Sequence, residues 1–184
     1  MLLHLREPVS AGSHAAGMLM GLALTWLFWR RCRPRQSLST WAARSNFDEC
    51  LEDAGLIAGY ERGKTWAMLV FGLSLAACYG GSALYHSAEP GKWLDLFRRI
   101  DHVGIYLLIA GTYTPAAWAL MTGPWRRATL STVWAVAIFC AGRVGIGGVL
   151  SPWATTLIYL GMGWGVLICY REFARELGHR RLLL

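Results

Sequence analysis

The stretch Trp66–His86, WAMLVFGLSLAACYGGSALYH, decides the fold. It runs for 21 residues without Asp, Glu, Lys or Arg. An α-helix rises 1.5 Å per residue, so a run of this length crosses the roughly 30 Å hydrocarbon core of a bilayer. The stretch therefore predicts a membrane-spanning helix.

Four further apolar runs of similar character lie on either side of this one, at about residues 8–29, 103–123, 128–150 and 153–170. Hydrophobic residues make up 55% of the 184-residue chain and charged residues 16%, against about 25% charged residues in soluble domains. The sequence predicts an all-α fold, a polytopic transmembrane helix bundle with five spans in a single membrane domain over residues 1–184. We expect a multi-pass protein of the cell membrane, with the lipid bilayer as its partner.

The net charge of +7 does not indicate nucleic-acid binding, because the basic residues lie in the short connections between apolar runs. Folding the five spans alternately places 13 of the 18 Lys and Arg residues on the side that holds the connection between the first two spans. Lys and Arg are enriched in cytoplasmic loops. The charge distribution therefore predicts that this side is cytoplasmic and that the N-terminus is outside.

The same alternation brings a set of polar residues together on the opposite side: His14, Ser82, His86, Asp101, His102 and Arg143. Ser82 and His86 stand four residues apart, on one face of a helix. Asp101 comes at the start of the next apolar run, at the same membrane level. Ionisable residues at the edge of hydrocarbon are functional candidates, so we expect one polar site there.

Two interpretations of this site are compatible with the spacing. In the first, His86 is a metal ligand, Asp101 orients the imidazole or holds a metal-bound water, and Ser82 donates a hydrogen bond to a ligand. In the second, Ser82 bonds its own helix backbone, His86 is an interfacial residue and Asp101 caps its helix.

The remaining polar residues are expected to play supporting parts. His102 is adjacent to Asp101 in sequence and points to another helical face, which favours a structural role. His14 is either a partner of the site or an interfacial residue. Arg143 either extends to the membrane surface or pairs with an acid such as Asp101.

Four stretches together resemble the hemolysin III family, the bacterial branch of the progestin and adipoQ receptor superfamily. They are Arg6-Glu7-Pro8-Val9-Ser10 leading to His14, SALYHS at 82–87, DHVGIYLLIAGTYTP at 101–115, and LIYLGMGW at 157–164. The similarity covers nearly the whole chain.

The resemblance implies a seven-helix membrane bundle with a zinc site and hydrolase activity on a lipid amide. By motif, His86 matches the helix-2 zinc ligand, Ser82 its companion serine, and Asp101 the acid near the metal-bound water. The other two ligands would be histidines in an HxxxH pattern on helix 7. Resemblance to the adiponectin-type receptors also implies a cytoplasmic N-terminus, the reverse of the orientation predicted from charge.

The chain departs from this pattern because it contains no HxxxH. We therefore predict a family member truncated before helices 6 and 7, with an incomplete zinc site. Two other functions stay open at this point: a membrane-perturbing or pore-forming cytolysin, and a receptor or scaffold without chemistry.

Overall fold

The computed structural model describes residues 5–32, 47–121 and 123–165, all of them helical or in short connections. Its helices are α1 (Pro8–Cys32), α3 (Phe47–Ser87), α4 (Leu94–Leu120), α5 (Gly123–Gly147) and α6 (Pro152–Trp164). The side chains of residues 32, 47–58, 60 and 61 lie outside this description. The predicted all-helical fold is confirmed.

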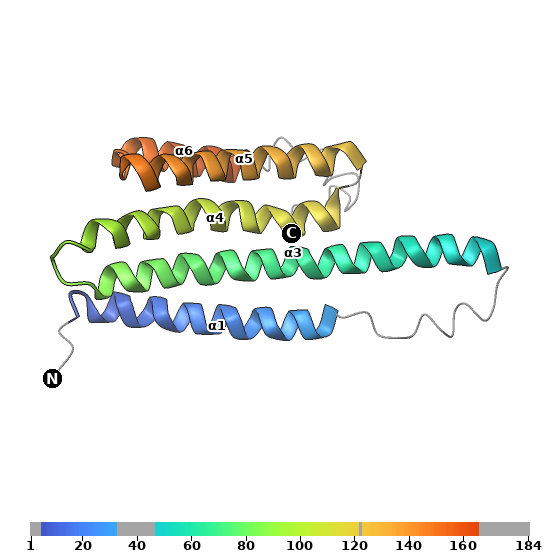
Figure 1. Ribbon diagram of the computed structural model, residues 1–184, viewed down its shortest axis with the longest axis horizontal. Coiled ribbons are helices and arrows are strands. Elements are labelled where there is room, and N and C mark those ends of the chain that lie inside the picture. Colours follow the sequence, from blue (N-terminus) through green and yellow to red (C-terminus); the bar gives the residue numbers. More distant parts are fainter. Residues whose placement is uncertain (1–4, 33–46, 122, 166–184) are drawn as a thin grey trace, which may run out of the picture.

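The long helices lie side by side in sequence order, with α3 between α1 and α4, and α4 between α3 and α5 (Figure 1). Within the described residues, four segments are long and apolar enough to cross a membrane: Pro8–Arg31, Arg62–Ser87, Leu94–Leu120 and Gly123–Gly147. The fifth expected span, 153–170, falls on α6, a helix of 13 residues, and its last five residues lie outside the described part of the chain.

Helix α3 is longer than the sequence suggested. The polar composition of residues 30–64 predicts a connection between two spans, with at most one short surface helix. Instead α3 begins at Phe47 and continues unbroken through the predicted span, 41 residues in all. The polar composition of a segment does not stop a helix when no proline or glycine pair interrupts it.

Helix α4 also begins earlier than expected, at Leu94, because the polar stretch before Asp101 is helical as well. Asp101 therefore lies about two turns inside α4 and is not its N-cap. Pro115 lies within α4, and the helix continues past it to Leu120. Membrane helices tolerate such a proline where neighbouring groups satisfy the freed carbonyl.

Glycines set the spacing between the central helices. A methyl group at Gly104 of α4 would come within 2.7 Å of the Cys78 Cα of α3, and one at Gly111 would overlap Ser74. On the other face of α3, a methyl group at Gly72 would overlap Thr25 of α1. Small residues at such crossings let two backbones approach closely, which is how membrane helices gain packing energy.

A second packing region joins α4, α5 and α6. Its buried residues are Tyr106, Ala110, Ala137, Cys140, Val144 and Met162. Polar side chains here are bonded between helices. The Trp134 indole donates to Thr114 Oγ1 at 3.1 Å, and the Tyr113 hydroxyl donates to the Met162 carbonyl at 2.6 Å. These bonds fix α5 and the end of α6 to α4.

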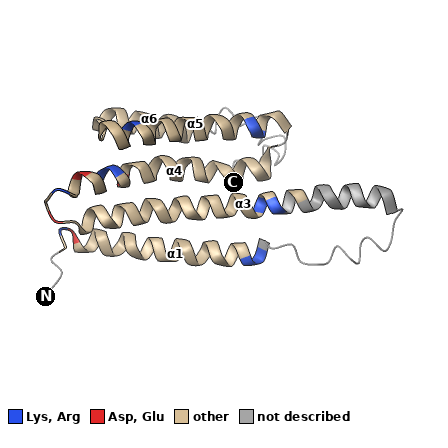
Figure 2. Cartoon of the chain, in the orientation of Figure 1, with Lys and Arg blue, Asp and Glu red and all other residues tan. Residues whose placement is uncertain are grey.

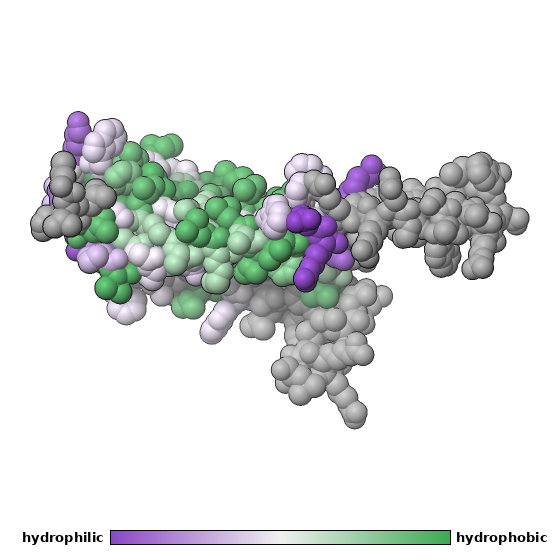
Figure 3. Space-filling model, turned by 90° about the horizontal axis from the view of Figure 1, so that it is seen from below, coloured by the Kyte–Doolittle hydropathy of each residue, from purple (hydrophilic) through white to green (hydrophobic). Residues whose placement is uncertain are grey.

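The outer surface suits a bilayer. Hydrophobic side chains cover the middle of the bundle, while hydrophilic ones gather toward its ends (Figure 3). Lys and Arg of the described helices flank the apolar part of the bundle on both sides; on α3 they lie partway along the helix, where its apolar part begins (Figure 2). All four carboxylates whose side chains are described, Glu7, Glu89, Asp95 and Asp101, lie at the end that holds His86.

Candidate functional site at the polar end of the bundle

The site centres on a bond that joins the start of α1 to the end of α3. The carboxylate of Glu7, one residue before α1, lies 2.8 Å from His86 Nδ1, near the end of α3. The Glu7 amide also donates to the His86 carbonyl at 3.1 Å. Because an ionised carboxylate only accepts hydrogen bonds, Nδ1 is the donor of this bond, and in a neutral imidazole Nε2 would keep the lone pair.

Aromatic and basic groups surround this pair. The His86 ring stacks on the His14 ring with centroids 5.3 Å apart and an interplanar angle of 5°. The Arg6 guanidinium lies 4.3 Å from the centre of the Tyr85 ring, and Arg6 Nε is 3.3 Å from a Glu7 oxygen. The N-terminal segment is thus held against the last turn of α3 by a cation, a carboxylate and two imidazoles.

Ser82 and Asp101 lie deeper in the bundle than His86. Ser82 is one turn earlier on α3 and is 8% exposed. Asp101 lies on α4 and is half-buried. Its neighbour Ile100 packs against Gly81 of α3, so Asp101 lies at about the same level as Gly81. Within the described residues no hydrogen bond or ion pair joins either of them to His86. The three residues therefore share one end of the bundle, as predicted, while His86 takes Glu7 as its partner.

His102 and Arg143 point away from this group. The Tyr159 hydroxyl lies 3.4 Å from His102 Nδ1, which ties His102 to α6 as expected for a structural residue. Arg143 lies on the exposed face of α5. In the part of the chain that the structure describes, no ion pair joins Arg143 to Asp101.

Glu7 is the site residue that sequence reasoning missed. It lies before the first apolar run and 79 positions from His86, so no helical spacing connects the two. Its position in the stretch Arg6-Glu7-Pro8 was the available sequence signal, because Pro8 starts α1 and leaves Glu7 just outside the helix.

The side chains that the structure describes do not form a complete metal site. Among the described residues, no group of three or more His, Cys, Asp and Glu is arranged to hold a metal ion. Of the histidines that the structure describes, His86 is the one with a carboxylate on a ring nitrogen, the arrangement usual for a histidine ligand. A catalytic zinc site has three protein ligands, so these residues fit one ligand position and not the whole set.

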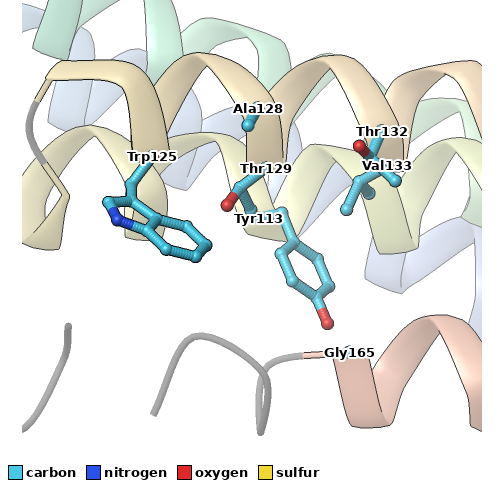
Figure 4. Close-up of a pocket in the computed structure, with 7 residues that line it drawn as sticks. All are labelled: Tyr113, Trp125, Ala128, Thr129, Thr132, Val133 and Gly165. Atoms are coloured by element: carbon cyan, nitrogen blue, oxygen red, sulfur yellow. The ribbon is translucent and has the colours of Figure 1, made fainter. Parts of the chain in front are cut away.

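A cavity of about 190 Å³ lies elsewhere, between α4, α5 and the end of α6. Tyr113, Trp125, Thr129 and Gly165 are among its lining residues, and the Tyr113 ring extends across it toward Gly165 (Figure 4). Its lining is mostly apolar, and it contains no residue of the polar site. It adds no chemistry to His86.

The helices and their apolar surface define an α-helical, multi-pass membrane protein. Comparison with known families then narrows this class. The sequence profile of the haemolysin-III related family matches residues 3–182, so the chain belongs to that family.

Two curated relatives are similar to the chain in sequence. The chain is 35% identical over 127 residues to Hemolysin-3 of Bacillus cereus, which covers 64% of this chain and 54% of that one. It is 32% identical over 126 residues to the Hemolysin-3 homolog of Bacillus subtilis (strain 168), covering 62% and 55%. The match thus spans about half the length of these relatives. No solved structure matches the chain.

Proposed function

We propose that this chain is a hemolysin III-type membrane protein resembling zinc-dependent membrane hydrolases, with one histidine of an incomplete metal site. The observation that carries the proposal is the 2.8 Å bond between Glu7 and His86 Nδ1. A carboxylate in this position orients a histidine ligand and makes its other nitrogen a stronger electron donor. His86 is the proposed zinc ligand.

Ser82 and Asp101 are the proposed catalytic residues of a completed site. Both lie closer to the middle of the membrane than His86, on the two helices that pack through Gly81 and Gly104. A lipid amide would reach them from the hydrocarbon side. The implied HxxxH ligands are absent from residues 1–184, so we expect no turnover from this chain alone.

A zinc-binding measurement tests the proposal. The full chain, purified in detergent and dialysed against a mild chelator, should retain well below one zinc per chain. One histidine and a distant carboxylate give too few ligands for tight binding. The matched control is His86→Ala, which should retain the same small amount.

Stoichiometric zinc that is lost in His86→Ala would contradict the incomplete site and would require ligands from His14, His102 or a second copy. Loss of folding in the variant is separated from loss of metal by circular dichroism of both proteins.

The names of the relatives support a second candidate function, membrane disruption, since both are called hemolysin-3. The exposed apolar band is compatible with it. Release of a trapped dye from liposomes on addition of the purified chain would favour this function. Retention of the dye by liposomes that contain the inserted chain would exclude it.

A further inference from the structure

Arg6 is a cation held among side chains at the polar end of the bundle, where α1 begins and α3 ends. Its side chain is 21% exposed, less than half of the 46% exposure of its neighbour Glu7. The guanidinium lies 4.3 Å from the centre of the Tyr85 ring, so an aromatic side chain of α3 covers one face of its plane. Most of the charged group is therefore out of water, which is unfavourable unless its N–H groups have acceptors.

The N–H groups of Arg6 lack such acceptors among the described residues. A guanidinium has five N–H donors in a fixed plane. The Nε atom is buried without a hydrogen-bond partner, and its contact with a Glu7 oxygen at 3.3 Å is an ion pair that lacks hydrogen-bond geometry. The two terminal nitrogens donate to no described residue. A planar fork of donors is thus left free against the Tyr85 ring.

The carboxylates at this end of the bundle do not fill the place. Glu7 is the described carboxylate that contacts Arg6, and it also accepts the shorter bond from His86 Nδ1, at 2.8 Å. Within the part of the chain that the structure describes, neither Glu89 nor Asp101 forms an ion pair with Arg6. One carboxylate is therefore shared between a guanidinium and an imidazole, and the group can take up a further anion.

We propose that Arg6 binds the phosphate group of a ligand at the membrane surface, beside His86. A guanidinium forms two parallel hydrogen bonds with phosphate oxygens, and the stack on Tyr85 fixes the plane in which these donors point. Lipid head groups and free phosphate both carry this group. The inference rests on the proposed function for the role of His86, and it deepens that function because it names a phosphate-bearing molecule as the ligand placed next to this histidine.

Binding of phosphate-bearing probes to the full chain in a neutral detergent tests the site. The dissociation constants of dioleoyl phosphatidic acid and of inorganic phosphate are measured from the shift that each probe causes in thermal unfolding. Arg6→Gln should weaken binding about tenfold, because it removes charge-assisted hydrogen bonds. Arg6→Lys should lie between the two, since lysine keeps the charge and lacks the fork.

Glu7→Gln separates a binding role of Arg6 from a structural one. The amide oxygen can still accept the bond from His86 Nδ1, while the negative charge beside Arg6 is lost. If Arg6 binds phosphate, this variant should bind the probe more tightly, by about threefold, the effect of one half-exposed charge. If Arg6 only holds Glu7 in place, both variants should weaken binding, and that result would overturn the proposal.

Lys92→Gln is the matched control for net charge. Lys92 is also a cation over an aromatic ring at this end of the bundle, 5.4 Å from the centre of the Trp93 ring, but it is exposed. Its loss should leave both dissociation constants unchanged. An equal loss of affinity in Lys92→Gln, or an unchanged affinity in Arg6→Gln, would contradict a site at Arg6. Circular dichroism of each variant establishes that it is folded.

The two probes identify the source of the phosphate. Binding that depends on Arg6 for phosphatidic acid alone supports a lipid head group, and binding that depends on Arg6 for both probes supports a site open to free phosphate. Binding of neither probe overturns the proposal. Zinc plays no part in these measurements, so the phosphate site and the metal site proposed at His86 can fail independently.

Discussion

Glu7 orients the His86 ring and should determine which ring nitrogen carries the proton in the neutral form, which can be measured. Because Nδ1 donates to the carboxylate, neutral His86 should be the Nδ1–H tautomer in the wild-type protein. Glu7→Ala removes the acceptor, and we expect the more common Nε2–H form to dominate. Nitrogen chemical shifts of a histidine-labelled sample, at a pH where the imidazole is neutral, report the tautomer.

Glu89→Ala is the matched control, since Glu89 is an exposed carboxylate at the same end of the bundle. It should leave the His86 tautomer unchanged. Glu7 is half-exposed, so its loss should lower the free energy of unfolding by only about 0.5 kcal/mol. An Nε2–H tautomer in the wild-type protein would show that the bond runs differently from the geometry described above.

At the scale of the helices, Gly104 is the position where α3 and α4 tolerate no extra atom. A methyl group there meets the backbone of Cys78, which cannot rotate away as a side chain can. We expect Gly104→Ala to lower the free energy of unfolding by about 1–3 kcal/mol. Thermal unfolding in a mild detergent measures the change.

Gly12→Ala is the control for this substitution, because a methyl group at Gly12 of α1 meets nothing within 4 Å. It should be neutral or slightly stabilising, since alanine favours the helix over glycine. Equal stability of the two variants would mean that the close approach of α3 and α4 does not hold in the membrane.

The helices could be predicted from the sequence because uncharged runs of spanning length are the strongest local signal in a membrane protein. It placed helix ends less well. Leu94 and Phe47 start their helices within polar segments, where composition alone does not mark a helix that continues past the membrane surface. The polar end of the bundle was found from span counting, which needs only the direction of each helix.

The partner of His86 could not be found in that way. Ser82 and Asp101 were chosen because their helical spacing or their neighbouring span placed them near His86. Glu7 reaches His86 through the packing of α1 on α3, which depends on contacts such as Gly17 with Tyr79. No pattern in the sequence encodes which face of α3 meets α1, so the bond appears only in three dimensions.

For the whole molecule, the unequal charge of the two ends predicts its orientation. The described carboxylates gather at the His86 end, while Arg30, Arg31, Arg126 and Arg127 lie at the other. The basic end should be cytoplasmic. In a background without native cysteines, Gly91→Cys should react with a membrane-impermeant thiol reagent in intact cells, and Pro124→Cys should not.

Both positions are exposed and flank connections at opposite ends of the bundle, so they differ in side and not in accessibility. Lysis before labelling should make both react. Reaction at Pro124→Cys alone in intact cells would reverse the assignment and would agree with the orientation of the adiponectin-type receptors.

The length of α3 carries it beyond the bilayer. Its 41 residues make a rod of about 60 Å, twice what the bilayer requires. The segment that is apolar enough to cross a membrane is Arg62–Ser87, so residues 47–61 precede it. At 1.5 Å per residue this part of α3 extends about 22 Å further, at the end of the helix opposite to the bond between Glu7 and His86.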